Sequence, residues 1–252
     1  ITDLSDELNS VIFNTGNQFK TYFKNITSSK SDVENESEEK FRQSLFRYIS
    51  TKTPTINHAG NDYEVELIDP IKKIFKKKIL FFLDIGVGTG CIMSSILKEI
   101  DHSRGIGVDI CKNTIFNAKI NLARLKVENR AKLLCRSFQE VFNHKFDLIV
   151  SNPPYVVKRE INRLSNDVKK FEPKHALDGG NDGLDVIRKV IYKSRSILKF
   201  NGILALEIGR GQYFSVLKIL KQNGFKNFRY IKDYQDNVRC IFSTLLEKNK
   251  KK

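Results

Sequence analysis

The sequence has few of the residues that build metal sites and disulfide frameworks. Its 252 residues include only 4 cysteines and 4 histidines, and no two cysteines form a C-x-x-C pair. Cysteines scattered in this way argue against a structural zinc site and against a set of disulfides, and they fit a reducing compartment. We therefore expect no metal ion and a cytoplasmic protein, bacterial in the first instance, with an organelle matrix as the alternative.

Long apolar runs are also absent. No stretch approaches the ~18 uncharged apolar residues that a membrane span needs, and residues 1–7 have neither the basic nor the apolar part of a secretory signal. We expect no membrane partner and a monomeric protein. The 40% of apolar residues nevertheless suffice for a core, so the length indicates one large domain, or one domain with a smaller appendage.

Basic residues outnumber acidic ones. The 44 Lys and Arg stand against 29 Asp and Glu, which gives a formal net charge of +15. An excess of this size favours transient contact with RNA or the ribosome, through electrostatic steering and counterion release. A composition rich in Lys, Asn and Ile produces the same excess without any function, so the charge alone leaves both interpretations open.

Two regions of different composition divide the chain. In residues 1–62, apolar residues recur with approximate helical spacing around a polar run near 28–38. We interpret this part as a small helical N-terminal region with a mobile loop. In residues 63–252, a helix at 63–77 leads into an alternation of apolar strands and helices, which we interpret as the main domain.

The alternation in the main domain predicts an α/β fold. Continuously apolar strands that alternate with helices indicate a mostly parallel sheet covered on both faces. The linker 233–237 is too short for a parallel crossover, so the last two strands should pair antiparallel. We expect a doubly wound, seven-stranded, mostly parallel sheet with a small N-terminal helical appendage. The expected strands are 79–85, 105–110, 132–137, 146–151, 202–208, 226–232 and 238–246, and the expected helices between them are 89–101, 112–126, 183–199 and 212–223.

A glycine-rich turn follows the first expected strand of the sheet. The run 84–90, D-I-G-V-G-T-G, leads from the strand into a helix, and glycines let the backbone turn tightly and let a ligand approach it. Its spacing differs from the G-x-G-x-x-G of dinucleotide sites, and Asp84 would repel a pyrophosphate but suits an amino-bearing ligand. Asp109 ends the second strand, where a carboxylate accepts hydrogen bonds from both hydroxyls of a ribose. The candidate cofactor-binding residues are Asp84, Gly86, Val87, Gly88, Thr89, Gly90 and Asp109.

The D-x-G-x-G-x-G run with a strand-terminal acid downstream resembles the cofactor motif of class I S-adenosylmethionine-dependent methyltransferases. The resemblance implies a Rossmann-like fold and S-adenosyl-L-methionine as cofactor. Family members usually carry Asp or Asn at the end of the third strand, followed by an aromatic residue, and these residues contact the adenine. Ser137 and Phe138 stand at these positions, so the resemblance assigns Phe138 to the apolar wall of the pocket and places Ser137 where an acid or amide is usual.

A rigid tetrapeptide follows the fourth expected strand. Asn152-Pro153-Pro154-Tyr155 comes directly after the apolar run 146–151, and consecutive prolines cannot continue a sheet ladder because neither has an N–H to donate. In a doubly wound sheet, ligands bind beyond the carboxyl ends of the strands where the strand order reverses, and the first and fourth strands flank that point. The tetrapeptide and the glycine loop should therefore face one cleft, with Asn152 belonging to both the cofactor pocket and the transfer site.

The tetrapeptide resembles the [D/N]-P-P-[Y/F/W] motif of methyltransferases that act on planar nitrogens, namely adenine N6, guanine N2 and glutamine N5. The resemblance makes Asn152, Pro153, Pro154 and Tyr155 the catalytic residues. The side-chain oxygen of Asn152 and the carbonyl of Pro153 would each accept one N–H of the substrate, and Tyr155 would stack on its flat group. A carboxylate has no N–H for this acceptor pair, so glutamine is preferred over glutamate.

Further motifs resemble those of the HemK/PrmC-type protein-(glutamine-N5) methyltransferases. The segment 172–185 is similar to the E-P-x-x-A-L-x-x-G-x-D-G-L-D run of that family, residues 207–209 and Arg239 match its later motifs, and the resemblance covers about 66–246. It implies methylation of the glutamine in the Gly-Gly-Gln motif of a class 1 peptide-chain release factor, which tunes translation termination. The family has a helical N-terminal domain followed by an L-I-P-R-x-E-T-E motif, of which residues 64–69 resemble only the tail. The resemblance therefore implies that residues 1–62 are a reduced or divergent form of that helical N-terminal region.

Two rival functions stay open on the sequence alone. A nucleic-acid methyltransferase for adenine N6 or guanine N2 would share both motifs and would use the basic charge, although the sequence indicates no separate target-recognition domain. A non-catalytic S-adenosylmethionine-binding protein would share the glycine loop but would not need the acceptor pair.

Overall fold

The computed structural model describes residues 62–75, 78–141, 144–164, 174–233 and 235–246. The predicted N-terminal helical region, its loop near 28–38 and the boundary at residue 62 therefore involve residues outside the described part, and they stay predictions. Within that part, no helix combines the length and the apolar character that crossing a membrane takes.

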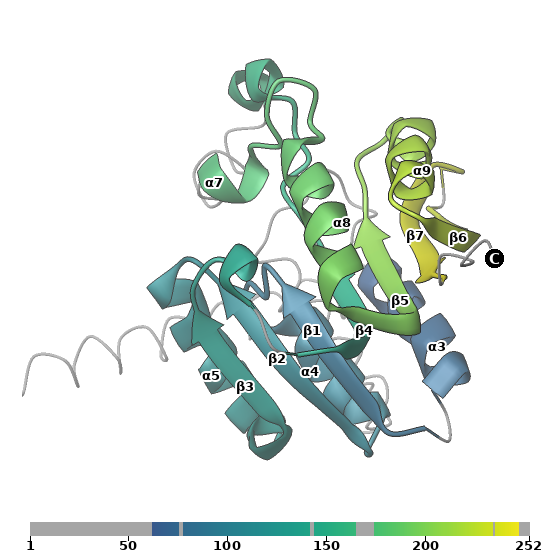
Figure 1. Cartoon of the computed structure of the whole chain (residues 1–252). Coiled ribbons are helices and arrows are strands. Elements are labelled where there is room, and N and C mark those ends of the chain that lie inside the picture. The colour runs from purple at the N-terminus through teal and green to yellow at the C-terminus, as the bar shows by residue number, and fades with distance from the viewer. Residues whose placement is uncertain (1–61, 76–77, 142–143, 165–173, 234, 247–252) are drawn as a thin grey trace, which may run out of the picture. The chain divides into compact units, whose positions relative to one another are not determined.

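A seven-stranded sheet forms the centre of the described part (Figure 1). Its strand order is β3-β2-β1-β4-β5-β7-β6, and the first five of these strands run parallel, whereas β7 is antiparallel to both β5 and β6. The order reverses between β1 and β4, which confirms the doubly wound fold and the antiparallel final pair. The strands are β1 (Leu80–Ile85), β2 (Ser103–Asp109), β3 (Ala131–Cys135), β4 (Phe146–Ser151), β5 (Leu198–Glu207), β6 (Phe225–Lys232) and β7 (Val238–Leu245).

The helices lie close to their expected positions. Each of the five helices predicted from residue 63 onward is present, with ends that differ by a few residues, and short helical turns add to them. The helices are α3 (Asp62–Phe75), α4 (Cys91–Glu99), α5 (Lys112–Arg124), α7 (Lys174–Leu177), α8 (Asp185–Ile197) and α9 (Tyr213–Gln222), and the 3₁₀ turns are η1 (Glu128–Arg130), η2 (Phe138–Glu140) and η3 (Lys158–Arg163).

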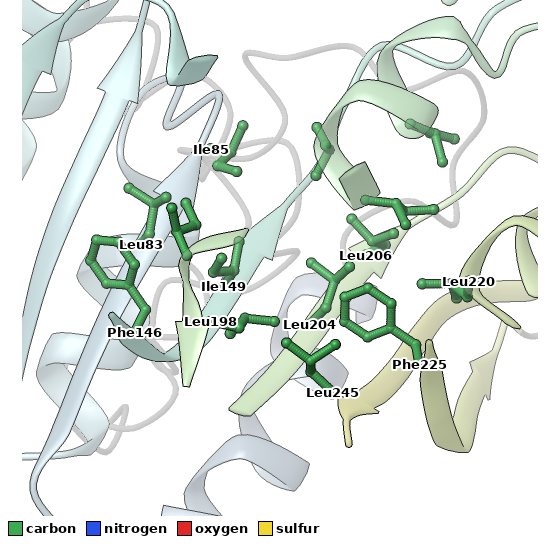
Figure 2. Close-up of a cluster of buried hydrophobic side chains, with 14 of the residues drawn as sticks. Leu83, Ile85, Phe146, Ile149, Leu198, Leu204, Leu206, Leu220, Phe225 and Leu245 are labelled. Carbon is green, nitrogen blue, oxygen red and sulfur yellow. The ribbon is translucent and has the colours of Figure 1, made fainter. Parts of the chain in front are cut away.

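Two hydrophobic clusters cover the two faces of the sheet, because successive side chains of a strand point to opposite faces. On one face, Leu83, Ile149 and Leu204 share a buried cluster with residues of α8 and α9, as Figure 2 shows for part of it. On the other face, Phe82 and Leu148 share a buried cluster with residues of α3, α4 and α5. The sheet is therefore covered on both faces, so we expect a ligand site at the carboxyl ends of its parallel strands.

β5 begins four residues earlier than the sequence indicated. The strand was expected at 202–208, but it starts at Leu198, which pairs with Phe146 before a register shift. Asn201 has a positive φ of 60°, a conformation that asparagine tolerates better than most residues. Residues 199–201 of the irregular start are exposed and show no regular apolar period, so the sequence did not indicate a strand there.

Candidate active site

The glycine loop is fixed at the carboxyl ends of β1 and β2. The N–H groups of Gly86 and Val87 both donate to the carbonyl of Val108, at 2.9 and 3.0 Å. Gly86, Gly88 and Gly90 have φ values of 71°, 55° and 82°, in the left-handed region that side chains disfavour. A Cβ atom at Gly86 would meet nothing within 4 Å, so the loop turns against open space at this point.

Val87 and Thr89, which the sequence also assigned to the cofactor pocket, have evident structural contacts. The Val87 side chain is buried in the cluster that includes residues of α4. The carbonyl of Thr89 accepts a hydrogen bond from Asn121 Nδ2 on α5, at 2.9 Å. Both residues thus attach the loop to its neighbours, and their cofactor contacts stay predictions.

Two carboxylates lie beside the loop. Asp109, at the end of β2, accepts from the N–H of Gly88 at 3.2 Å and from the N–H of Cys111 at 2.9 Å. It therefore joins the glycine loop to the start of α5 and stays half-buried. Asp84 is only 1% exposed, and its Cα is in register with Gly107 of β2 and with a residue of β4. A buried carboxylate is costly in itself, so this position favours a cationic or amino-bearing neighbour.

Ser137 and Phe138 follow β3 and form a local turn. The Ser137 hydroxyl accepts from the N–H of Gln139 at 3.2 Å and so caps η2. Phe138 is half-buried and packs against the cluster under α8. Lys193 of α8 donates to the carbonyl of Gln139 at 2.9 Å, a contact that the sequence did not reveal. The predicted roles of these residues beside an adenine stay predictions.

The Asn-Pro-Pro-Tyr segment begins beside the glycine loop. Ile85 and Ser151 are the last register pair of β1 and β4, so Gly86 and Asn152 are the first residues beyond it. Asn152 is half-buried rather than packed into the interior, and Pro153 is buried. Among the residues that the structure describes, neither the Asn152 side chain nor the Pro153 carbonyl takes part in a hydrogen bond.

The Tyr155 side chain lies against a buried ion pair. Arg239 Nη2 donates to the Tyr155 hydroxyl at 3.2 Å, and this hydroxyl donates to Glu207 Oε1 at 3.4 Å. Arg239 and Glu207 are 3.6 Å apart, and the guanidinium carbon lies over the Tyr155 ring, 5.5 Å from its centroid. Burial, and after it the negative charge of Glu207, raise the pKa of Tyr155 well above its usual range, so the hydroxyl stays protonated.

The main chain of Tyr155 is held by Gln212, which immediately precedes α9. Gln212 Nε2 donates to the carbonyl of Tyr155 and to the carbonyl of Gly183, both at 3.1 Å. Gln212 Oε1 accepts from the N–H of Gly209 at 2.8 Å. One side chain therefore joins the Asn-Pro-Pro-Tyr segment to the end of β5 and to the loop before α8.

The loop 178–185 packs on the continuation of the tetrapeptide. Val156 forms a parallel bridge with Asp178, and its carbonyl accepts from the N–H of Gly179 at 2.9 Å. A Cβ atom at Gly179 would lie 2.8 Å from the Cα of Tyr155, so only glycine fits this approach. The described part of the E-P-x-x-A-L-x-x-G-x-D-G-L-D segment thus contacts the site. Its first two residues, 172 and 173, lie outside the described residues.

Sequence reasoning assigned no site role to the three residues that hold Tyr155. Glu207 and Arg239 occur in motifs that resemble those of a methyltransferase family, and this resemblance was the available signal. Gln212 had no signal, because a single glutamine before a helix is common and two of its three partners, Tyr155 and Gly183, are distant in the chain.

The chain is similar to several known methyltransferases in sequence and in fold. The family model "Methyltransferase small domain" matches residues 66–170. A release factor glutamine methyltransferase of Clostridium acetobutylicum is 33% identical over 245 residues, which cover 90% of this chain and 80% of the relative. A SAM-dependent O-methyltransferase of Thermotoga maritima, a solved structure, has a TM-score of 0.55 at 16% identity and covers 82% of this chain and 73% of that one. The structural likeness supports the fold alone.

Other relatives match over a smaller share of their length. A release factor glutamine methyltransferase of Rhodospirillum rubrum is 36% identical over 161 residues, which cover 64% of this chain and 50% of the relative. Three more relatives of the same name are covered over 55% to 61% of their length. The chain thus spans little more than half of these relatives.

Proposed function

The chain belongs to the family of release factor glutamine methyltransferases, and we propose that it transfers a methyl group from S-adenosyl-L-methionine to a glutamine of a peptide-chain release factor. The acceptor atom would be the side-chain amide nitrogen of the glutamine in the Gly-Gly-Gln motif. The enzyme would act on the free factor as a monomer, in a bacterial cytoplasm or an organelle matrix.

The residues around the glycine loop suit S-adenosyl-L-methionine. The Asp109 carboxylate, half-buried at the end of β2, has the acceptor chemistry that a pair of ribose hydroxyls needs. The loop presents open space at Gly86, and the buried Asp84 favours the amino-bearing part of the molecule. Phe138 offers an apolar surface beyond β3. When bound, S-adenosyl-L-methionine supplies a methyl group that its sulfonium already activates for transfer.

The Asn-Pro-Pro-Tyr segment suits the substrate amide. An amide nitrogen is a poor nucleophile because its lone pair is delocalised, so it must be oriented. The side-chain oxygen of Asn152 and the carbonyl of Pro153 would accept one N–H each, and the consecutive prolines hold that carbonyl with little ordering on binding. Fixed acceptors of this kind would stabilise the positive charge that develops on the nitrogen.

The proton of the amide leaves after transfer in this proposal. Tyr155 is not the base, because its neutral form is favoured by burial and by Glu207. Glu207 is itself bound to Arg239 and to the Tyr155 hydroxyl. The enzyme therefore works by orientation and by fixed dipoles rather than by removing a proton first.

The register of β1 and β4 is the single observation that supports the proposal most. Ile85 pairs with Ser151, so the cofactor loop and the acceptor segment leave the sheet from neighbouring positions. The test uses S-adenosylmethionine labelled in its methyl group. Label should appear on a release-factor fragment that contains Gly-Gly-Gln and should vanish when the glutamine is replaced by alanine. Label in RNA or DNA, with none in the fragment, would reject the protein substrate.

A further inference from the structure

Tyr155 is held at both ends by residues outside its own motif. Its hydroxyl lies 3.2 Å from Arg239 Nη2, and its carbonyl lies 3.1 Å from Gln212 Nε2. Building on the proposed function, we infer that Arg239 and Gln212 are positioning residues for methyl transfer. They hold the segment 152–155 in the form that receives the substrate amide.

The side-chain end is fixed by an ion pair that cannot easily move. The side chains of Arg239 and Glu207 are only 13% and 7% exposed, and their charged groups are 3.6 Å apart. Separating a buried pair leaves an uncompensated charge, which is strongly destabilising. The two residues belong to β7 and β5, which pair antiparallel in the sheet (Figure 1). The Tyr155 hydroxyl is therefore anchored to a rigid part of the fold.

The main-chain carbonyl of Tyr155 is held by the side-chain amide of Gln212, which uses both its nitrogen and its oxygen. Gln212 donates to the carbonyls of Tyr155 and Gly183 and accepts from the N–H of Gly209. A Cβ atom at Gly183 would lie 2.7 Å from Gln212 Nε2, and one at Gly209 would lie 2.9 Å from Gln212 Oε1. Glycine at both positions thus makes room for this side chain.

These anchors matter because the acceptor carbonyl is close to them in the chain. Pro153 precedes Tyr155 by two residues, and the proline backbone between them is stiff, so a shift of Tyr155 moves the Pro153 carbonyl. A displacement of ~1 Å in a transfer site can reduce the rate about 100-fold. Loss of either anchor should therefore lower turnover while leaving the cofactor loop, which is attached to Val108 and Asp109, in place.

Gln212→Glu tests the main-chain anchor with little change of size. It keeps the acceptor for Gly209 but replaces the donor with an oxygen that faces two carbonyls. The matched control is Gln222→Glu, the same change at an exposed position of α9. We expect Gln212→Glu to lower kcat about 100-fold relative to the control, with equal affinity for S-adenosylmethionine by calorimetry. Equal kcat in the two variants would overturn the role of Gln212.

Arg239→Lys tests the side-chain anchor, with the exposed Arg229→Lys on β6 as the control. Lysine keeps the charge but loses the planar fork, so kcat should fall in Arg239→Lys and not in the control.

A double-mutant cycle combines Arg239→Lys with Tyr155→Phe, which removes the hydroxyl that Arg239 contacts. If Arg239 acts through the hydroxyl, the double variant should be no slower than Arg239→Lys, whereas additive losses would overturn that role.

Hydrogen exchange gives a readout that does not depend on activity. Amides of residues 155–157 should exchange faster in Gln212→Glu than in Gln222→Glu, because the segment loses its main-chain anchor. Unchanged exchange would overturn the positioning role even if the wild-type protein transferred no methyl. If the wild-type protein transfers no methyl group but exchange is still faster in Gln212→Glu, the proposed function is rejected, whereas the role of Gln212 in holding the segment is supported.

Discussion

The Ser151 hydroxyl donates to the main-chain carbonyl of Ile85 at 2.8 Å, which ties the carboxyl end of β4 to the carboxyl end of β1. The same two residues are the last pair in the register of these strands. Gly86 and Asn152 therefore leave the sheet from adjacent strands, and the glycine loop and the Asn-Pro-Pro-Tyr segment start from one place.

Ser151→Ala removes this tie. The substitution should lower the free energy of unfolding by about 1 kcal/mol, the usual net contribution of one intramolecular hydrogen bond. Urea unfolding measures the change. Ser215→Ala, at an exposed position of α9, is the control and should stay within about 0.5 kcal/mol of the wild type. If both variants are equally stable, the hydroxyl does not hold the two strand ends together.

Gly86→Ala separates backbone strain from cofactor binding. Gly86 and Gly224 both have positive φ, 71° and 84°, and a Cβ atom at either would meet nothing within 4 Å. Alanine should therefore destabilise the fold at both positions by about 1–2 kcal/mol, through strain alone. Only Gly86→Ala should also weaken S-adenosylmethionine binding, as measured by calorimetry. Equal affinity in the two variants would remove Gly86 from the cofactor site.

The Tyr155 phenol should keep its proton above the pH at which a tyrosine side chain usually ionises. Burial and Glu207 raise its pKa, so its phenol stays protonated when ordinary tyrosines ionise near pH 10. The stability that this proton contributes is fully present below the unfolded-state pKa and is lost as the pH rises toward the folded-state value. Alkaline difference spectra of the wild type and Tyr155→Phe should coincide through the ordinary range. A difference near pH 10 would show that the phenol is not shielded.

Asp109→Ala should weaken the binding of S-adenosylmethionine more than it slows methyl transfer. The variant loses the proposed partner of the ribose hydroxyls, and it also frees the N–H of Gly88. Hydrogen bonds to a charged group contribute about 1.5–3 kcal/mol, so the affinity for S-adenosylmethionine should fall accordingly. Asp101→Ala, at an exposed position before β2, is the control. Unchanged affinity in Asp109→Ala would contradict the assignment.

Local patterns were sufficient to predict the fold of the main domain. The mostly apolar run 146–151 became β4 with the same bounds, because a buried parallel strand carries apolar side chains on both faces. The short linker between the last two strands correctly indicated an antiparallel pair. The start of β5 was missed, since residues 199–201 are exposed and form an irregularity in the strand that no hydrophobic period reveals.

The candidate site, like the fold, was predictable from the sequence only in part. The glycine loop and Asn152 follow strand ends and Asp109 is itself the last residue of β2, so the topology of the sheet was enough to predict that they lie at the same edge. The contacts of Tyr155 with Arg239 and Gln212 join residues 84 and 57 positions apart. Such contacts depend on how loops pack after the sheet has formed, and a single sequence carries no periodic signal for them.

Asn152→Ala tests the central claim most directly, because Asn152 is the proposed side-chain acceptor for the substrate amide. The measurement compares methyl transfer to a release-factor fragment with the affinity for S-adenosylmethionine, in the variant and in the wild type. We predict that turnover falls at least about 100-fold, as for the loss of one fixed hydrogen-bonding group in a transfer site, while the cofactor still binds. Turnover close to that of the wild type would contradict the account.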